Sequence, residues 1–345
     1  MNVLIASPLG PRLAQRIAET DDRIELTYLP DLIPRARWRG DDVGEDGAPP
    51  EDPRWEAPLQ RAEVLFGIPG GSPEGLLDAA RRAPALNRVQ ARNAGAGEQL
   101  GGALRLAPGE LQHLVVTTTS GVHAGPLAEW ALFGLLAFAK DLPALLADQR
   151  ERHWPSVQRS ARELRDRTLL IVGLGEIGTE TARLAQAFGM HVLAVKRDAT
   201  GEAPHVDELH PADDLRALVG RADGIVVTLP LTDATRGLLD AGTLAAVKPG
   251  AVLVNVGRGA VVDEVALAER LQDGTLAGAA LDVFAEEPLP ADSSLWGLEN
   301  VIVSPHNAAL VEAEEGRVVD LFCDNLRRRL AGEPLRNELD PEVLY

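Results

Sequence analysis

Three polar side chains with complementary chemistry stand in the second half of the chain. Arg258, Glu287 and His306 each lie a few residues after an apolar run that is typical of a buried strand. An arginine can hold a carboxylate and polarise a ketone, a histidine can deliver a proton to oxygen, and a glutamate can tune that histidine. A lone His or Glu in such a place is more often structural. Here all three follow strands, and a glycine-rich turn of the kind that binds dinucleotides precedes them in the chain. Together they predict reduction of a 2-oxo acid.

A glycine-rich turn precedes these residues. Thr168–Val172 runs directly into the sequence GLGEIG, and a helical pattern follows over Ile177–Phe188. Gly173 permits a tight turn, Gly175 lets the backbone approach a pyrophosphate, and Gly178 lets the helix pack on the strand. A bare G-x-G-x-x-G match is weak, whereas this strand, turn and helix together predict a dinucleotide site. The expected contacts are Gly173, Gly175, Glu176, Ile177 and Gly178.

The end of the next strand bears on which dinucleotide binds. An NAD site commonly places Asp or Glu about 20 residues beyond the glycines. Here the strand His191–Val195 ends in Lys196 and Arg197, two cations that suit a 2′-phosphate. The pair favours NADP over NAD. The alternative is a surface basic pair, with Asp198 binding ribose at the end of a slightly longer strand.

Short apolar segments alternate with helical patterns along the chain, which predicts an α/β fold with doubly wound parallel sheets. The last six segments alternate strictly with helices, notably Ile177–Phe188 and Val262–Gln272. A long helix is expected from His123 to about Ala147. The expected strands are Val3–Ser7, Val64–Phe66, Arg88–Gln90, Leu114–Thr118, Thr168–Val172, His191–Val195, Gly224–Thr228, Ala251–Val256, Leu276–Leu281 and Val301–Val303, and Pro73–Arg82 is an expected helix.

Length, charge and cysteine content bound the class of protein. At about 150 residues per domain, 345 residues predict two domains. The chain has 34 Lys and Arg against 52 Asp and Glu, and a net charge of −18 argues against nucleic acid or an anionic membrane as partner. The single cysteine, Cys323, allows no intrachain disulfide, and no Cys/His spacing indicates a metal site. Between Pro34 and Pro58 we expect an exposed acidic insertion.

The N-terminus has no basic stretch ahead of a long apolar one, so no signal peptide is expected. The longest apolar run, Trp130–Ala139, has about half the length of a membrane-spanning helix. We therefore expect a cytoplasmic protein.

Taken in order, the motifs resemble those of the D-isomer-specific 2-hydroxyacid dehydrogenases. The match covers nearly the whole dinucleotide-binding region and, more loosely, the rest of the chain. The matching segments are Ala128-Glu129, Gly173–Gly178, Pro230–Thr232, Asn255–Gly259, Gly278–Phe284, Glu287–Pro290 and Ser304–Ala308.

The resemblance implies a role for each residue of the site. Arg258 would bind the substrate carboxylate and carbonyl, and His306 would be the acid/base in forming a D-2-hydroxy acid. Glu287 would pair with His306 and raise its pKa. Asp282 would contact the nicotinamide carboxamide, with Val256 and Pro230 lining the cofactor. In a Gly-rich loop, Ala94–Gly97, the N–H groups of Ala96 and Gly97 would hold the substrate carboxylate, although an ordinary glycine turn is the alternative.

The same resemblance implies two Rossmann-like domains with the cofactor and substrate in the cleft between them. Residues 1–120 and 308–345 would form a discontinuous substrate domain, including a returning helix from Ala308 to about Leu330. Residues 121–307 would form the NAD(P)-binding domain. The helix from His123 would be a dimer contact, and a helix buried within one chain is an equally good interpretation.

Several features narrow the choice of substrate within this family. Many relatives have Asp-Asn where this chain has Glu98-Gln99, and phosphoglycerate-type members tend to carry Arg in place of Asn93. Both departures, and a chain end at Tyr345 that leaves no room for a regulatory domain, weaken a phosphoglycerate assignment. Formate dehydrogenases, which are similar in fold, use Gln in place of Glu287, so formate is not the expected substrate. The alternatives are a dinucleotide-sensing binding protein on the same fold, a dehydrogenase for another small anion such as phosphite, or one for glyoxylate and hydroxypyruvate.

Overall fold

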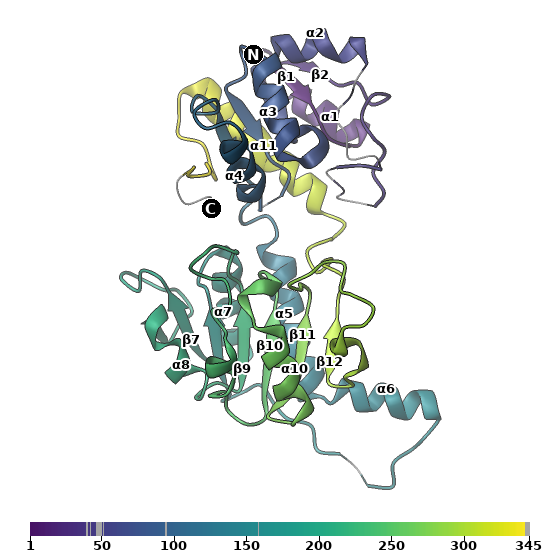
Figure 1. Ribbon diagram of the computed structural model, residues 1–345, viewed down its shortest axis with the longest axis vertical. Coiled ribbons are helices and arrows are strands. Elements are labelled where there is room, and N and C mark those ends of the chain that lie inside the picture. The colour runs from purple at the N-terminus through teal and green to yellow at the C-terminus, as the bar shows by residue number, and fades with distance from the viewer. Residues whose placement is uncertain are drawn as a thin grey trace. The chain divides into compact units, whose positions relative to one another are not determined.

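Parallel strands form two separate sheets in a computed structural model of the protein, which describes residues 1–38, 41, 43–45, 50, 52–93, 95–157 and 159–341. The chain divides into two compact units: unit 1 is Met1–Val122 with Leu310–Tyr345, and unit 2 is His123–Ala309. Each unit is a Rossmann-like α/β layer structure, so the predicted fold class is confirmed. Figure 1 shows both sheets and the helices that cover them.

Unit 1 contains a sheet of order β2-β1-β3-β4-β5 in which every pair is parallel. Leu4, Leu65 and Val89 are fully buried, because helices cover both faces of the sheet. Strand β2 was not expected from the sequence, since its residues Glu-Leu-Thr carry little apolar character. The elements are β1 (Asn2–Ile5), α1 (Pro11–Ala18), β2 (Glu25–Thr27), α2 (Pro53–Arg61), β3 (Val64–Phe66), α3 (Pro73–Arg82), β4 (Arg88–Gln90), α4 (Gly97–Leu106), β5 (Val115–Thr117) and α11 (Glu314–Ala331).

Unit 2 contains a parallel sheet of order β12-β11-β10-β9-β6-β7-β8. The strand order reverses between β6 and β9, and sheets of this kind bind ligands outside the carboxyl ends of the strands at that point. The polar edge strand β8 was not expected. The elements are α5 (Ala124–Ala139), α6 (Leu142–Glu151), β6 (Thr168–Val172), α7 (Glu176–Ala187), β7 (His191–Lys196), β8 (Glu208–Pro211), α8 (Leu215–Leu218), β9 (Gly224–Val227), α9 (Ala241–Leu244), β10 (Ala251–Asn255), α10 (Glu264–Gln272), β11 (Leu276–Leu281) and β12 (Val301–Val303).

The single helix expected from His123 to about Ala147 is wrong, because α5 and α6 are separate helices bent by 63°. Asp141 has a φ of +55°, a left-handed conformation that Asp tolerates, and Pro143 then lies in the first turn of α6. Within the described residues, no helix by itself is long and apolar enough to cross a membrane. The bent pair α5 and α6 meets that length and composition criterion only when taken together.

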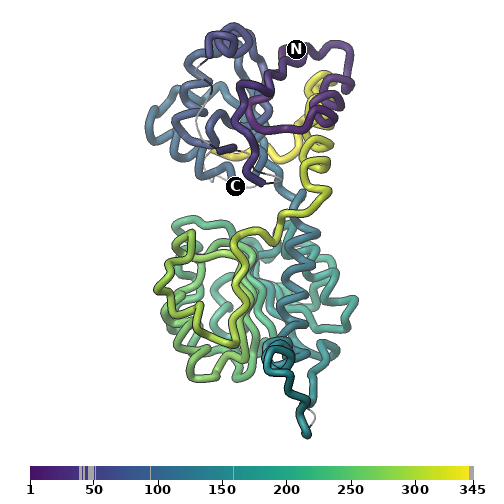
Figure 2. The backbone as a smooth tube through the Cα atoms, turned by 90° about the vertical axis from the view of Figure 1, so that its right-hand side faces the viewer, coloured from purple at the N-terminus to yellow at the C-terminus, as the bar shows by residue number. Residues whose placement is uncertain are grey.

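Helix α11 returns to unit 1 and lies beside α1, as Figure 2 shows in yellow and purple. It begins at Glu314 rather than at Ala308, where the sequence analysis placed its start. The N–H groups of Asn307 and Ala308 instead bind the Asp282 carboxylate, which keeps this segment in a turn. Beyond α11, the Leu339 N–H donates to Val116 O over 2.8 Å and attaches the last described residues to β5.

Candidate active site

Three glycines shape the turn between β6 and α7 in different ways. Gly173 has a φ of +107°, and its N–H donates to Val195 O over 3.1 Å. A Cβ on Gly178 would lie 2.2 Å from Gly173 O, so only glycine lets α7 begin against the strand. A Cβ on Gly175 would meet no atom within 4 Å. The turn therefore leaves open space before a 12-residue helix, which fits a dinucleotide pyrophosphate.

The contrast between two of these glycines gives a testable prediction. Gly178→Ala should destabilise the protein by about 1–3 kcal/mol, since its methyl group would overlap a backbone oxygen. Gly175→Ala should leave the free energy of unfolding unchanged and weaken dinucleotide binding by roughly tenfold, because the methyl group would fill the open space. Urea denaturation and a fluorescence titration with NADPH measure the two effects. Equal losses of stability in both variants would contradict the prediction.

Basic residues stand where β7 ends. Lys196 is its last residue, Arg197 follows, and both are exposed. Asp198 Oδ1 accepts hydrogen bonds from the side chain and the N–H of Thr200, and these bonds, with the charges of Lys196 and Arg197, hold the pKa of Asp198 below its ordinary value. The Asp198 carboxylate is thus engaged within its own turn, and the two cations lie at the exposed strand end.

Arg258 lies on the loop after β10, where Val256 and Gly257 separate it from the end of the strand. Asn255 Nδ2 donates to Arg258 O over 3.1 Å, and Asn255 Oδ1 accepts the Gly257 N–H. The Arg258 Nη1 donates to Gly257 O over 2.8 Å, and the residue is half-buried. A Cβ on Gly259 would lie 1.8 Å from the carbonyl carbon of Phe284, so this loop packs tightly on the segment that leads to Glu287.

His306 and Glu287 form a direct pair. His306 Nδ1 lies 2.7 Å from Glu287 Oε2, while Glu287 Oε1 accepts the Phe284 N–H over 2.9 Å. The His306 side chain is 49% exposed, so its ring remains open to a reacting molecule. Because Nδ1 faces the carboxylate, Nε2 is the nitrogen that can exchange a proton with a substrate.

The electrostatics of the pair favour a protonated histidine. The hydrogen bond to Glu287 raises the pKa of His306, and this outweighs burial and the Arg258 charge, both of which lower it. Burial would raise the pKa of Glu287, but hydrogen bonds from His306 and the Phe284 N–H, with the charges of His306 and Arg258, bring it below its ordinary value. The arrangement can therefore hold an imidazolium beside a carboxylate and a guanidinium.

Buried Asp282 organises the turn that carries His306. Its Oδ1 accepts hydrogen bonds from Ser304 Oγ and from the N–H groups of Asn307 (2.9 Å) and Ala308 (3.0 Å). The His306 N–H donates to Asp282 O over 2.9 Å, and His306 has a φ of +53°. Sequence reasoning missed this role of Ser304 and Asn307, although a buried carboxylate always needs donors and Asp282 follows a strand. No described residue donates to Asp282 Oδ2.

Among the described residues, four other expected site residues form no hydrogen bond or ion pair with these side chains. Val256 is buried in the core of unit 2, and Pro230 is exposed in the turn after β9, where its carbonyl accepts a hydrogen bond from Thr235. Ala96 precedes α4 and Gly97 begins it, both buried in unit 1. Ala94 lies outside the described residues, as do parts of the acidic insertion.

Comparisons with known proteins show the family of the chain. The family model "D-isomer specific 2-hydroxyacid dehydrogenase, NAD binding domain" matches residues 132–308. The chain is 37% identical to (S)-sulfolactate dehydrogenase of Chromohalobacter salexigens over 63% of this chain and 70% of that protein. It is 40% identical to D-3-phosphoglycerate dehydrogenase of Mycobacterium tuberculosis over 64% of this chain, but the match spans only 41% of that protein's length.

Solved structures match over nearly the whole length. A D-isomer specific 2-hydroxyacid dehydrogenase from Xanthobacter autotrophicus Py2, in complex with NADPH and MES, is 29% identical with a TM-score of 0.77 over 99% of both chains. The NADPH-dependent glyoxylate/hydroxypyruvate reductase of Sinorhizobium meliloti, in complex with NADP and sulfate, is 25% identical with a TM-score of 0.75 over 99% of both chains.

Proposed function

Because the chain belongs to the D-isomer specific 2-hydroxyacid dehydrogenases, a family of NAD(P)-dependent oxidoreductases, we propose that it reduces a small 2-oxo acid to the D-2-hydroxy acid. The observation that carries this proposal is the 2.7 Å contact between His306 Nδ1 and Glu287 Oε2, with the Arg258 charge acting on both groups.

Each side chain of unit 2 has a defined task in this reaction. Arg258 binds the substrate carboxylate and polarises the carbonyl oxygen. His306 Nε2–H donates its proton to that oxygen as the carbonyl is reduced, and Glu287 stabilises the imidazolium until the proton leaves. When bound, the dinucleotide supplies the hydride that reduces the carbonyl carbon. Gly173, Gly175, Glu176, Ile177 and Gly178 would hold its pyrophosphate, Pro230 and Val256 would line it, and Asp282 would contact its carboxamide.

In unit 1 we propose the N–H groups of Ala96 and Gly97 as donors to a substrate carboxylate. The N–H groups of Ala96 and Gly97 belong to the start of α4, where the first N–H groups of a helix have no partner within the helix. Such groups bind anions, and the small residues allow close approach of the substrate. Unit 1 is thus the substrate domain and unit 2 the dinucleotide domain.

A panel of 2-oxo acids tests the reaction directly. NADPH oxidation is followed at 340 nm with glyoxylate, hydroxypyruvate, sulfopyruvate and phosphohydroxypyruvate, and the product is analysed for its D configuration. Turnover of glyoxylate or hydroxypyruvate with little on phosphohydroxypyruvate is expected, because Asn93 stands where phosphoglycerate-type members carry Arg. Tight NADPH binding without turnover of any oxo acid would favour a dinucleotide-sensing protein instead.

NADP is the proposed dinucleotide. Lys196 and Arg197 stand at the exposed end of β7, and Asp198, the alternative ribose ligand, already binds Thr200. We expect Lys196→Ala/Arg197→Ala to lower kcat/KM for NADPH by roughly 10²- to 10⁴-fold, since each of two charge-assisted hydrogen bonds contributes about 1.5–3 kcal/mol. The same variant should change kcat/KM for NADH by less than about threefold, which serves as the internal control. Equal losses with both dinucleotides would contradict the assignment.

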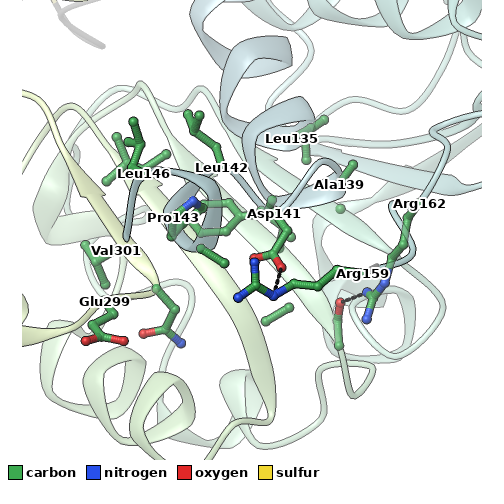
Figure 3. Close-up of a pocket in the computed structure, with 18 of the residues that line it drawn as sticks. Leu135, Ala139, Asp141, Leu142, Pro143, Leu146, Arg159, Arg162, Glu299 and Val301 are labelled. Carbon is green, nitrogen blue, oxygen red and sulfur yellow. Dashed lines mark hydrogen bonds and ion pairs between the residues drawn. The ribbon is translucent and has the colours of Figure 1, made fainter. Parts of the chain in front are cut away.

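A homodimer is the proposed assembly. None of the residues of α6 is buried, and a ten-residue helix is marginal in water without packing partners. Between α6 and the amino ends of β9 to β12 lies a cavity of about 950 Å³, lined by Leu142 and Leu146 on one side and by Val301 on the other (Figure 3). In a two-fold dimer both copies contribute the same surface to the interface. We propose that this surface is α6 together with the cavity beside it.

Light scattering tests the assembly. Leu145→Glu/Leu146→Glu should convert a dimer to a monomer, because both leucines are exposed on α6 and a charge in an apolar interface is costly. Leu106→Glu, at an equally exposed leucine of unit 1, is the matched control and should remain a dimer. A wild-type monomer at micromolar concentration would contradict the proposal.

The proposed location is the cytoplasm. The one cysteine, Cys323, is a buried free thiol, which suits a reducing compartment. Cell fractionation with an antibody against the chain tests this directly.

A further inference from the structure

Glu264, the first residue of α10, is a half-buried carboxylate without a task in the reaction described above. Within the described residues, no Lys, Arg or His forms an ion pair with it. Burying a carboxylate without a cation is costly, so its position needs a compensating contact. The contact that it makes is with the backbone of the catalytic segment, where the Ala285 N–H donates to Glu264 Oε1.

The turn from Phe284 to Glu287 is bound by two carboxylates in succession. The Phe284 N–H donates to Glu287 Oε1, and the next N–H, that of Ala285, donates to Glu264 Oε1. Gly259 packs on the same two residues so closely that a Cβ would lie within 2.3 Å of three of their backbone atoms. The turn that presents Glu287 to His306 is thus held from outside by the segment that follows Arg258.

We propose that Glu264 is a positioning residue that fixes the turn carrying Glu287, and thereby keeps the Glu287 carboxylate against His306. This inference rests on the proposed function only for its effect on turnover. The charge of Glu287 contributes to a raised pKa of Glu264, which places the two carboxylates within electrostatic reach of each other. The charged groups with the largest effect on the His306 pKa are Glu287, Arg258 and Asp282, so we expect Glu264 to act on His306 through Glu287.

The decisive measurement is the titration of His306 without substrate. In Glu264→Ala the Ala285 N–H loses its acceptor, and we expect the His306 pKa, followed by NMR and assigned with His306→Asn, to fall toward the ordinary imidazole value. In Glu264→Gln the amide oxygen still accepts from Ala285, and most of the shift should be restored. A shift in Glu264→Gln as large as in Glu264→Ala would mean that the charge matters, and would overturn the proposal.

Kinetics and stability complete the test. We expect Glu264→Ala to lower kcat/KM for the oxo acid by roughly 10- to 10²-fold, as a misplaced catalytic group does, and to move the alkaline limb of its pH profile to lower pH. Glu269→Ala, an exposed position on the same helix, is the matched control. An unchanged His306 titration in Glu264→Ala, whatever its melting temperature, would overturn the proposal. If no variant turned over an oxo acid, yet the titration shifted, the proposed function would fail and this positioning role would stand.

Discussion

Replacing His306 by Asn is expected to lower kcat for 2-oxo acid reduction by roughly 10²- to 10⁴-fold, the contribution that a positioned acid makes. The substituted side chain cannot deliver a proton to the carbonyl oxygen, while Arg258 and the glycine turn, the proposed binding sites for substrate and dinucleotide, are unchanged. Steady-state kinetics with the best oxo acid measures the loss, and a fluorescence titration with NADPH should give an unchanged dissociation constant.

Asn is the appropriate substitution because of the backbone at this position. His306 has a φ of +53°, and Asn is among the residues that adopt such a conformation most readily. An Ala variant would add backbone strain to the loss of the imidazole. Activity in His306→Asn within about threefold of wild type would remove His306 from the proton-transfer role.

The pH dependence of the wild type has a defined sign. The Glu287 hydrogen bond raises the pKa of His306, so the imidazolium needed for reduction persists to higher pH than in an ordinary histidine and is lost as the pH rises through that raised value. kcat/KM for reduction should therefore fall on the alkaline side. Glu287→Gln removes the carboxylate, and its alkaline limb should move to lower pH. A limb that did not move would show that the limb belongs to another group.

The fold of unit 2 could be predicted closely from the sequence. Buried parallel strands are continuous apolar runs, and helices with glycine turns separate them, so β6, β9 and β10 were placed within a residue of their observed limits. Strands β2 and β8 were not predicted because they are edge strands with polar sequences, which lack the apolar run of a buried strand. The break between α5 and α6 was missed because the apolar pattern of α5 runs up to it, and only Asp141 and Pro143 mark it.

In the candidate site, the reacting side chains could be predicted from the sequence, but the contacts that hold them in place could not. Arg258, Glu287 and His306 could be named because strand ends of a parallel sheet meet at one edge and because the motifs resemble a known family. The contacts of Asp282 with the His306 turn, and of Glu264 with Ala285, could not be named. They join a side chain to a backbone N–H 20 or more residues away, and an N–H carries no sequence signal.

Replacing Arg258 by Gln is expected to lower kcat/KM for the oxo acid by roughly 30-fold to several thousand-fold, since removing one partner of a close charge pair costs about 2–5 kcal/mol. Arg258→Lys retains the charge but not the planar pair of donors, and should lie between Gln and wild type. The KM for NADPH should stay within about threefold of wild type in both variants. A fully active Arg258→Gln would mean that the substrate carboxylate is bound elsewhere.

The pH profiles of the Arg258 variants give a second and sharper test, because the charge of Arg258 lowers the pKa of His306. Removing that charge in Arg258→Gln should raise the His306 pKa and move the alkaline limb of reduction to higher pH, opposite to the movement in Glu287→Gln. Arg258→Lys should leave the limb near its wild-type position, since the charge remains. A structural defect would impair all three variants without separating their limbs in opposite directions. Opposite movements would therefore show that Arg258 lowers and Glu287 raises the pKa of the same imidazole.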